Sequence, residues 1–487
     1  MKITAQRLKK TALAALFVYA GLLFFYSGYY FFNNRMYLSN TDSFYYYNIA
    51  ENLRHSGKLQ STVVHEPEKV VTPQIGIVLI MASFLGMGLT RDGVFMAISA
   101  LYFLLYAAGI YPLYKLGKST GLSSFAGVAL VIAYLANTLN LHENMQVLNE
   151  GAFNALALWA MLLAARFLER EKDLPATATP RAPYFLNGVA AIVCSSVMIV
   201  FRTQGLLIVL SILLATIYLS VKKRSLRAAM YAGIFFCATL VSFYAFNHLL
   251  GVQHQVFFSH ATLVYAFKFD RLLQKAVLFA QNYLFFSVAL LLLLRSLFKP
   301  DAIVPLFLLI ACILSLVFTF SLEYNLIINR YIAYIWPITF LFILLEPRVR
   351  YAGYALVVFI LLQSTLTCRR VHEFYCYEPL YLYMHSRGIT LPPHSIVASY
   401  PAYDRISGYF LQTPVWHSLE HCIDTARTTQ PLFIVGPREF LSKQLTIAQS
   451  ASRQARRGLV LDTVSAGFAD AAGDALIRLR LTGQPLE

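Results

Sequence analysis

The stretch of sequence that organises this chain is Leu38–Gly86, LSNTDSFYYYNIAENLRHSGKLQSTVVHEPEKVVTPQIGIVLIMASFLG. It follows the first long apolar run and is mostly polar. Asp42 stands in front of the aromatic block Phe44–Tyr47, and Thr72-Pro73 lead into a short apolar segment. A long polar segment near the start is unusual in such an apolar chain. We therefore expect this segment to take part in the chemistry.

The composition is that of a membrane protein. Of the 487 residues, 58% are hydrophobic and only 13% are charged, whereas a soluble domain carries roughly a quarter charged residues. Many segments reach the roughly 20 apolar residues that a helix needs to cross a bilayer. The formal net charge is +16, but lysine and arginine gather in short clusters between apolar runs, as the positive-inside rule predicts. Because they form no broad basic face, nucleic acid is not an expected partner.

A basic N-terminus precedes the first apolar run, Thr11–Phe32, which ends in bulky aromatic residues. A signal peptide has a shorter core and a small-residue cleavage site, so we interpret this run as an uncleaved span with a cytoplasmic N-terminus. The first loop, residues 33–92, then lies outside. Pro73–Leu89 is at the short limit for a crossing, and it could span or lie in the interface. The interfacial interpretation places every later basic cluster inside, and we adopt it.

The predicted fold is an all-α polytopic membrane domain with this juxtamembrane helix, followed by a small α/β domain outside the membrane. The eleven predicted spans are 11–32, 93–114, 122–141, 151–168, 184–201, 205–221, 229–250, 276–295, 302–320, 331–345 and 351–367. An odd number of spans places the C-terminus outside. From residue 368 the apolar runs shrink to strand length, at 395–399, 431–435, 459–464 and 475–479, with helices expected at 378–386 and 438–448. The predicted domains are therefore 1–367 and 368–487.

Many ionisable residues collect at the predicted outer ends of the spans. They are Asp42, Glu143, Glu150, Arg202, His254, His260, Lys268, Glu323 and Arg330. Such groups are costly at bilayer depth and usually face a cavity or one another, although each could also be an interfacial charge that reaches water. Asp42 could equally cap the helix that follows it, and Tyr45–Tyr47 could form an interface belt or stack on a sugar ring.

The order of these parts resembles a known superfamily. An aspartate precedes an aromatic-rich helix, which ends in an AxNLxxxGK turn over residues 50–58. A proline-led juxtamembrane helix, an acid at the head of the fourth span, the Arg202-Thr203-Gln204-Gly205 turn and Arg330-Tyr331 before Pro337 follow. This order resembles the GT-C superfamily of membrane glycosyltransferases, and is most similar to the branch of the lipid A aminoarabinose transferase and the protein O-mannosyltransferases. The resemblance covers most of the membrane region.

The resemblance implies a polyprenyl-phosphate sugar donor, undecaprenyl phosphate in a bacterium, and transfer on the outer face of the membrane. Asp42 matches the catalytic aspartate of the first loop, and Glu150 matches an acidic position at the start of the fourth span. Arg202 and Arg330 match basic positions that suit a lipid phosphate. We further assign Lys69 and Arg54 to the lipid phosphate, and to the substrate, besides Glu150, the side chains of Tyr45, Tyr46, Glu143 and His260.

The sequence also departs from its relatives. Thr72 stands where the aminoarabinose transferases have a lysine before the juxtamembrane proline, and the nearest cation is Lys69. Ser43 follows Asp42, whereas the O-mannosyltransferases have two adjacent acids. The WWDYG signature of oligosaccharyltransferases is absent, which argues against the transfer of a whole glycan to asparagine.

The chemistry of these residues is consistent with such a transfer. Phosphate is a good leaving group, so one carboxylate that deprotonates the acceptor hydroxyl suffices, and the carboxylate pair of glycosidases is not needed. Arginine side chains would hold the phosphate. We expect Asp42 to act as the base with inversion of configuration. No acid stands beside Asp42 in the chain, and hard ions need several oxygen ligands, so a tightly held divalent metal is not favoured.

The site of action and the acceptor are less constrained. The compact loops favour a bacterial inner membrane, where the protein would contact membrane lipids. The acceptor could be a glycan, a glycolipid or a secreted protein. Cys194, Cys237 and Cys312 lie in apolar runs and are expected to be inert, while Cys376 and Cys422 lie in the polar C-terminal region, which permits a disulfide.

Two other functions remain open. A multi-span transporter or flippase of a lipid-linked sugar would also contain intramembrane charges, but here the charges lie at one mouth rather than at the midplane, and no inverted repeat is visible. A polymerase or ligase of surface polysaccharide would carry out a similar transfer with diphosphate-linked donors.

Overall fold

The computed structural model describes most of the chain. The described residues are 2–33, 41–62, 75–173, 182–224, 227–249, 284–297, 302–321, 333–367, 391, 394–400, 415–416, 419, 422, 432–436, 440–444, 446, 458–465 and 475–482. They divide into two compact units. Unit 1 comprises Met1–Asn33, Thr72–Ile77 and Ala97–Val371, and unit 2 comprises Asn34–Val71, Val78–Met96 and His372–Glu487.

Unit 1 is a bundle of apolar helices. Its described helices are α1 (Lys2–Asn33), α5 (Ile110–Ser119), α6 (Ser124–Ala136), α7 (Thr138–Met145), α8 (Glu150–Asp173), α9 (Ala182–Phe201), α10 (Gly205–Lys223), α11 (Arg227–Leu249), α14 (Leu284–Leu297), α15 (Ile303–Ser321), α17 (Trp336–Leu345) and α18 (Arg350–Thr367). Two further helices, α3 (Gly76–Gly86) and α4 (Arg91–Ala108), have one end in each unit. Apart from α3, which was predicted as a juxtamembrane helix, these helices overlap the predicted spans as far as the described residues reach, and the predicted span 93–114 is divided between α4 and α5.

Length and apolarity identify the helices that could cross a membrane. Among the described residues, four segments are long and apolar enough: Lys10–Asn33, Arg91–Ser119, Glu150–Asp173 and Gly205–Lys223. The bent pair α6 and α7 is a fifth. By contrast, α3 has 11 residues and is roughly 17 Å long at 1.5 Å per residue, about half of the hydrocarbon thickness. Its length agrees with the juxtamembrane interpretation, while the number of crossings stays a prediction.

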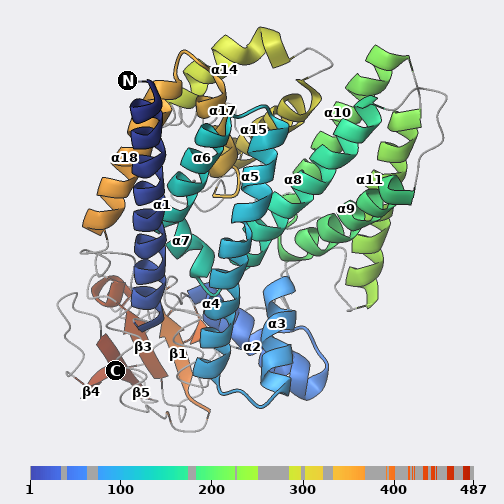
Figure 1. The fold of residues 1–487 in the computed structure, drawn as a ribbon. Coiled ribbons are helices and arrows are strands. Elements are labelled where there is room, and N and C mark those ends of the chain that lie inside the picture. Colours follow the sequence, from blue (N-terminus) through green and yellow to red (C-terminus); the bar gives the residue numbers. More distant parts are fainter. Residues whose placement is uncertain are drawn as a thin grey trace. The chain divides into compact units, whose positions relative to one another are not determined.

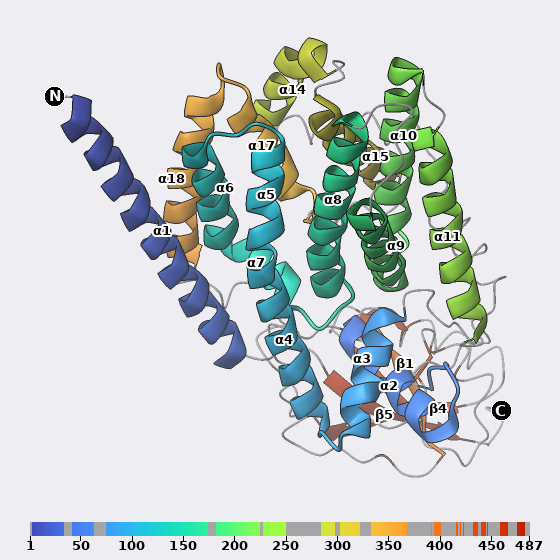
Figure 2. The ribbon, with the colours of Figure 1, turned by 45° about the vertical axis from the view of Figure 1, so that its right-hand side comes forward.

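Helix α8 forms the centre of the bundle, and α1 lies at its edge. Of the apolar window of α8, 78% is buried, against 28% for α1. Figure 1 shows α8 between α5 and α10, and it packs on both of them as well as on α9 and α15. Helix α1 packs on α6 and α7 and touches α18 (Figure 2). Its exposed side carries large apolar residues such as Leu22 and Phe25, which suits contact with lipid.

Helices α6 and α7 meet at a break at Asn137, where they differ in direction by 59°, and together they form a broken span or a re-entrant loop. The break frees backbone groups, which must find partners inside a membrane. The side chain of Asn137 accepts a hydrogen bond of 3.0 Å from the backbone N–H of Asn140. The backbone N–H of Thr138 donates to Ser364 of α18 at 3.4 Å. These bonds provide acceptors for two of the N–H groups at the bend.

In unit 2, helix α2 (Thr41–Ser56) packs its aromatic side on the start of α4. The rings of Phe44 and Tyr47 lie 5.5 and 5.6 Å from the ring of Phe95. Gly57 ends α2 with a φ of +68°, and its N–H donates to the carbonyl of Leu53, the usual arrangement of a helix end. The chain then returns along α2, where Asn52 donates to the carbonyl of Gln60 at 2.9 Å. Asn52 and Gly57 of the AxNLxxxGK turn thus stabilise the end of α2 and the chain that follows it.

The C-terminal residues form a five-stranded mixed sheet of order β2-β1-β3-β5-β4. The strands are β1 (Ile396–Ser399), β2 (Val415–Trp416), β3 (Leu432–Gly436), β4 (Gly458–Ser465) and β5 (Ala475–Thr482). Strand β1 pairs in parallel with β2 and β3, and β5 runs antiparallel to β3 and β4. The predicted strands correspond to β1, β3, β4 and β5, but β2 was not predicted.

A small apolar core lies against this sheet, built from Ala398, Leu419, Cys422, Leu432, Ile434 and Leu441. Cys422 is a free thiol, and Cys376 lies outside the described residues. Of the predicted helices, 378–386 also lies outside them, whereas residues 440–444 are helical. The division of the chain at residues 367 and 368 stays a prediction.

Candidate functional site

Asp42 lies in the first turn of α2, which begins at Thr41. The expectation that a helix starts at this point is correct. A carboxylate is favoured here because the unpaired N–H groups give a helix N-terminus partial positive charge. The side chain of Asp42 is partly exposed, whereas the following Ser43 and Phe44 are buried. Asp42 is therefore only partly enclosed by unit 2.

The tyrosines that follow are mostly enclosed by protein. Tyr45 and Tyr46 are each only 8% exposed, and their ring centroids are 5.9 Å apart. Phe44 and Tyr47 are the two residues that contact Phe95. Packing of α2 accounts for most of the aromatic block. Stacking of a sugar on Tyr45 and Tyr46 stays a prediction, for which only a small part of each ring is accessible.

Arg54, the predicted phosphate ligand of unit 2 that the structure describes, does not lie near Asp42. Arg54 lies in the last turn of α2 and is exposed. The 12 positions between the two residues correspond to about 18 Å along the helix. Arg54 and Asp42 are therefore at opposite ends of one helix and cannot bind one phosphate group together. Three other predicted site residues, Lys69, His260 and Arg330, lie outside the described residues.

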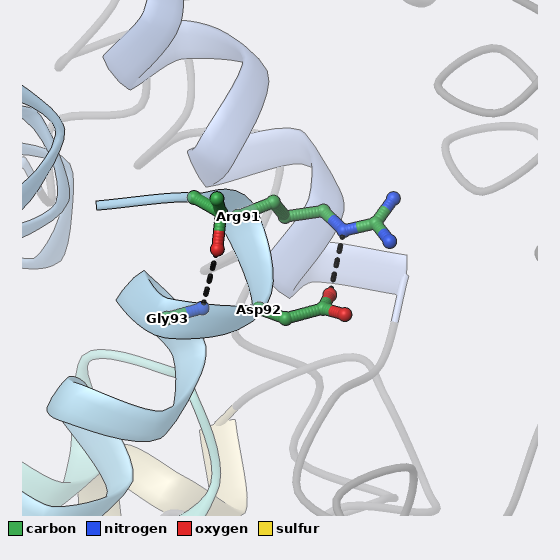
Figure 3. A network of polar contacts seen from close by, with 4 residues as sticks. Arg91, Asp92 and Gly93 are labelled. Atoms are coloured by element: carbon green, nitrogen blue, oxygen red, sulfur yellow. Dashed lines mark hydrogen bonds and ion pairs between the residues drawn. The ribbon is translucent and has the colours of Figure 1, made fainter. Parts of the chain in front are cut away.

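Sequence reasoning missed a group of titratable residues where α2 meets the start of α4. Glu51 is half-buried, and burial raises the pKa of its carboxyl, opposed by a hydrogen bond from Tyr47 and by the charges of His55 and Arg91. Arg91 also donates from Nε to Oδ1 of Asp92 at 3.0 Å, as Figure 3 shows. Its five donors allow Arg91 to serve more than one acid. Glu51 and Arg91 are far apart in the sequence, so no sequence motif could indicate that they lie close together.

The two best-defined predicted residues of unit 1 are paired with each other. Glu150 is the first residue of α8, and Arg202 directly follows α9. Nη1 of Arg202 lies 2.5 Å from Oε1 of Glu150, and the residues are 4% and 2% exposed. A tight turn follows, in which the N–H of Gly205 donates to the carbonyl of Arg202 at 3.0 Å. The structure thus brings the two residues to one end of the bundle, as their predicted location on one side of the membrane requires.

Other residues surround this pair. Arg202 is near enough to interact electrostatically with Tyr334, whose hydroxyl donates to Ser315 at 2.5 Å. The ring of Tyr334 also packs edge-on against Phe153 of α8 at 5.0 Å. A buried ion pair is stable only when each charge keeps its partner, because desolvation of a lone charge is costly. This arrangement can hold a positive guanidinium in an apolar bundle.

Glu143 lies in α7 and is half-buried. The preceding His142 is buried, and its ring centroid lies 5.0 Å from that of Phe31. The chain between Glu143 and Glu150 is short, but the structure shows no described contact that joins the two carboxylates. Among the described residues, no three His, Cys, Asp or Glu side chains come close enough to hold a metal ion.

Unit 1 also contains a cavity of about 290 Å³. It lies between α14, α17 and α18, beside the break at Asn137, and is lined mainly by apolar residues, among them Phe286, Trp336 and Phe340. None of the predicted site residues that the structure describes lines it.

The sequence matches no protein-family model and no curated protein. Several solved structures share its fold, including one of AglB and two of ArnT. The oligosaccharyltransferase AglB from Archaeoglobus fulgidus, in complex with an inhibitory peptide and a dolichol-phosphate, has a TM-score of 0.57 at 11% identity over 96% of this chain and 74% of its own. ArnT from Cupriavidus metallidurans has a TM-score of 0.52 at 13% identity in the apo state. The structure of ArnT bound to undecaprenyl phosphate has a TM-score of 0.54 at 14% identity. Both ArnT matches cover 96% of this chain and 98% of the ArnT chain.

The fold is that of the GT-C glycosyltransferases. The resemblance stated from the sequence is confirmed at the level of fold, over nearly the whole chain. A structural match at 11–14% sequence identity establishes the shared fold but not the roles of single residues. The chemistry of the site must therefore be argued from the residues of this chain.

Proposed function

We propose that the protein is a GT-C membrane glycosyltransferase that moves a sugar from a polyprenyl-phosphate donor to a hydroxyl acceptor. The observation that carries the proposal is the shared fold along 96% of the chain with ArnT, one of whose structures holds undecaprenyl phosphate. The AglB structure likewise holds a dolichol-phosphate. Both bound lipids are polyprenyl phosphates, which favours a lipid-phosphate donor for this protein. The acceptor of this protein is a glycan, a glycolipid or a secreted protein.

In the proposed reaction, Asp42 acts as the general base. Its carboxylate takes the proton of the acceptor hydroxyl while that oxygen forms a bond to the anomeric carbon. The bond from the anomeric carbon to the phosphate oxygen breaks, and polyprenyl phosphate leaves with the bonding electrons. Attack from the side opposite to the phosphate inverts the configuration. The partly exposed place of Asp42 in the first turn of α2 supports this role.

Arg202, Arg330 and Lys69 are the proposed ligands of the lipid phosphate. Arg202 already donates to Glu150. A guanidinium has five donors, so Arg202 can bind a phosphate oxygen while it keeps Glu150. In this proposal Glu150 holds Arg202 in place and restricts its orientation. Tyr45, Tyr46, Glu143 and His260 are the proposed contacts of the sugar and acceptor.

The proposed setting is a bacterial inner membrane, crossed eleven times. The N-terminus is cytoplasmic in this proposal. The loop that contains Asp42 and the C-terminal sheet both face the periplasm. The apolar helices and the GT-C fold support a multi-pass membrane protein, and the positive-inside rule supports the orientation.

Release of polyprenyl phosphate tests the proposal. Purified protein in lipid nanodiscs is incubated with polyprenyl-phosphate sugars and candidate acceptors, and the lipid products are measured by mass spectrometry. A transporter or flippase would leave the donor intact, and a polymerase or ligase would use only diphosphate-linked donors. We expect Asp42→Asn to abolish release without a change in thermal stability. The matched control is Asp92→Asn, because Asp92 is also in the first turn of a helix of unit 2 but is paired with Arg91. Full activity of Asp42→Asn would end the assignment of the base.

A further inference from the structure

The start of α3 is fastened to the start of α8 by a single side chain. The backbone N–H of Ile77 donates a buried hydrogen bond of 3.1 Å to Oδ1 of Asn149. Ile77 is the second residue of α3, and the first N–H groups of a helix find no acceptor within the helix. The backbone carbonyl of Asn149 accepts in turn from the N–H of Phe153 in α8. Asn149 therefore joins the beginnings of two helices.

The neighbouring residue of α3 is held from the other side. Gly76 lies so close to the ring of Phe201 that a Cβ atom at this position would overlap the ring. Only glycine allows this approach. Phe201 is the last residue of α9 and directly precedes Arg202, just as Asn149 directly precedes Glu150. We call Gly76, Ile77, Asn149 and Phe201 the α3 anchor, and its two halves are the chain neighbours of the two members of the buried ion pair.

The α3 anchor holds the part of α3 that belongs to unit 1. Thr72–Ile77 belong to unit 1, whereas the chain before and after them, Asn34–Val71 and Val78–Met96, belongs to unit 2. All four residues of the anchor lie in unit 1, as do Glu150 and Arg202. The anchor therefore acts within this unit, at the helix ends that bear the buried ion pair.

We propose that Asn149 is a positioning residue of the transfer reaction. Its hydrogen bond to Ile77, together with the contact between Gly76 and Phe201, fixes the helix ends that bear Glu150 and Arg202. The inference rests on the proposed function, because it concerns the placement of Arg202, the proposed ligand of the donor phosphate. Loss of about 1 Å of placement can cost on the order of 100-fold in rate without any loss of a reacting group.

Two measurements on Asn149→Ala test this role. Hydrogen–deuterium exchange of the peptide that contains Ile77 reports the bond itself, and we expect its amide to lose protection. Release of polyprenyl phosphate at saturating donor and acceptor reports the placement, and we expect kcat to fall roughly tenfold or more with a smaller change in the KM for the donor. Asn149→Asp keeps an acceptor oxygen of the same shape, and we expect it to keep the protection of Ile77 and most of kcat.

Asn140→Ala is the control. Asn140 is a buried asparagine of α7 whose side chain donates to the hydroxyl of Tyr106 at 3.3 Å and has no described bond to α3. It should lower thermal stability to a similar extent but leave kcat near the wild-type value.

The outcomes separate this inference from the proposed function. Lost protection of Ile77 with an unchanged kcat would overturn the positioning role and leave the glycosyltransferase intact. Equal falls in kcat for Asn149→Ala and Asn140→Ala would reduce the role to stability and overturn it as well. A wild-type protein that releases no polyprenyl phosphate would overturn the proposed function, while the exchange measurement would still test the bond. If Asn149→Ala does not fold, Asn149→Asp takes its place. An Asn149→Asp protein whose Ile77 amide is unprotected but whose kcat equals that of wild type would contradict the positioning role.

Discussion

Arg202 donates a hydrogen bond of 2.5 Å to Oε1 of Glu150, and both residues are almost completely buried. The two are 52 positions apart in the chain and belong to neighbouring helices of the bundle. Each had been assigned a separate partner from the sequence, a substrate for Glu150 and a lipid phosphate for Arg202. Their pairing means that neither can be changed alone without leaving a charge in an apolar environment.

The stability of the pair can be measured by a double-mutant cycle. We expect Arg202→Met and Glu150→Gln each to lower the free energy of unfolding, with Arg202→Met costing about 3–5 kcal/mol because it leaves a buried carboxylate uncompensated. The double variant should cost clearly less than the sum of the two, since it removes both charges. Thermal unfolding in detergent would follow the three variants, and additive losses would show that the pair does not exist in solution.

A second prediction concerns the steric half of the α3 anchor. Gly76→Ala should force α3 away from Phe201, because its new Cβ would overlap the ring, and the rate of polyprenyl phosphate release should fall. Addition of Phe201→Ala removes the ring and should restore part of the loss, although Phe201→Ala alone leaves a cavity that lowers stability. A double variant no better than Gly76→Ala would contradict the contact.

The Glu51 carboxyl should give unit 2 a pH-dependent stability. Burial raises its pKa above 4.5, so the folded state binds this proton more tightly than the unfolded state. The stabilisation is complete below pH 4.5 and is lost as the pH rises through the folded-state pKa. At neutral pH the half-buried carboxylate opposes folding, and Glu51→Gln removes that cost.

The thermal unfolding temperatures of wild type and Glu51→Gln, measured from pH 4 to pH 7.5, test this expectation. The variant should gain relative to wild type as the pH rises. If the difference in unfolding temperature between the variant and wild type stayed constant over this range, or grew toward acid pH, burial would not dominate the pKa of Glu51. The charges of His55 and Arg91 would then outweigh the effect of burial.

Cys422 provides a test of the C-terminal core. Burial raises the pKa of its thiol to about 12, and the thiolate is the form that reacts. Iodoacetamide at pH 8 should therefore leave Cys422 unmodified in the folded protein and alkylate it after denaturation in SDS, as peptide mass spectrometry would show. If Cys422 remained unmodified in SDS and reacted only after reduction, it would be in a disulfide, and the free thiol would be wrong.

Much of the fold could be predicted because it depends on local properties of the chain. A run of apolar residues of helical length defines a helix in a membrane wherever it stands, so the described helices follow the predicted spans. Strands of ordinary length, such as Leu432–Gly436, were predicted for the same reason. Strand β2 was not, because its two residues are too short for a pattern and pair only after β1 is in place.

The candidate site divides in the same way. The sequence by itself determined that Asp42 begins a helix, that the turn at Gly57 ends it, and that Glu150 and Arg202 stand at helix ends, since capping and turn chemistry act over a few residues. Only the tertiary structure decided that Glu150 and Arg202 pair and that Asn149 holds the start of α3. Those relationships join residues distant in the chain, and their energies depend on burial that exists only once the helices have packed.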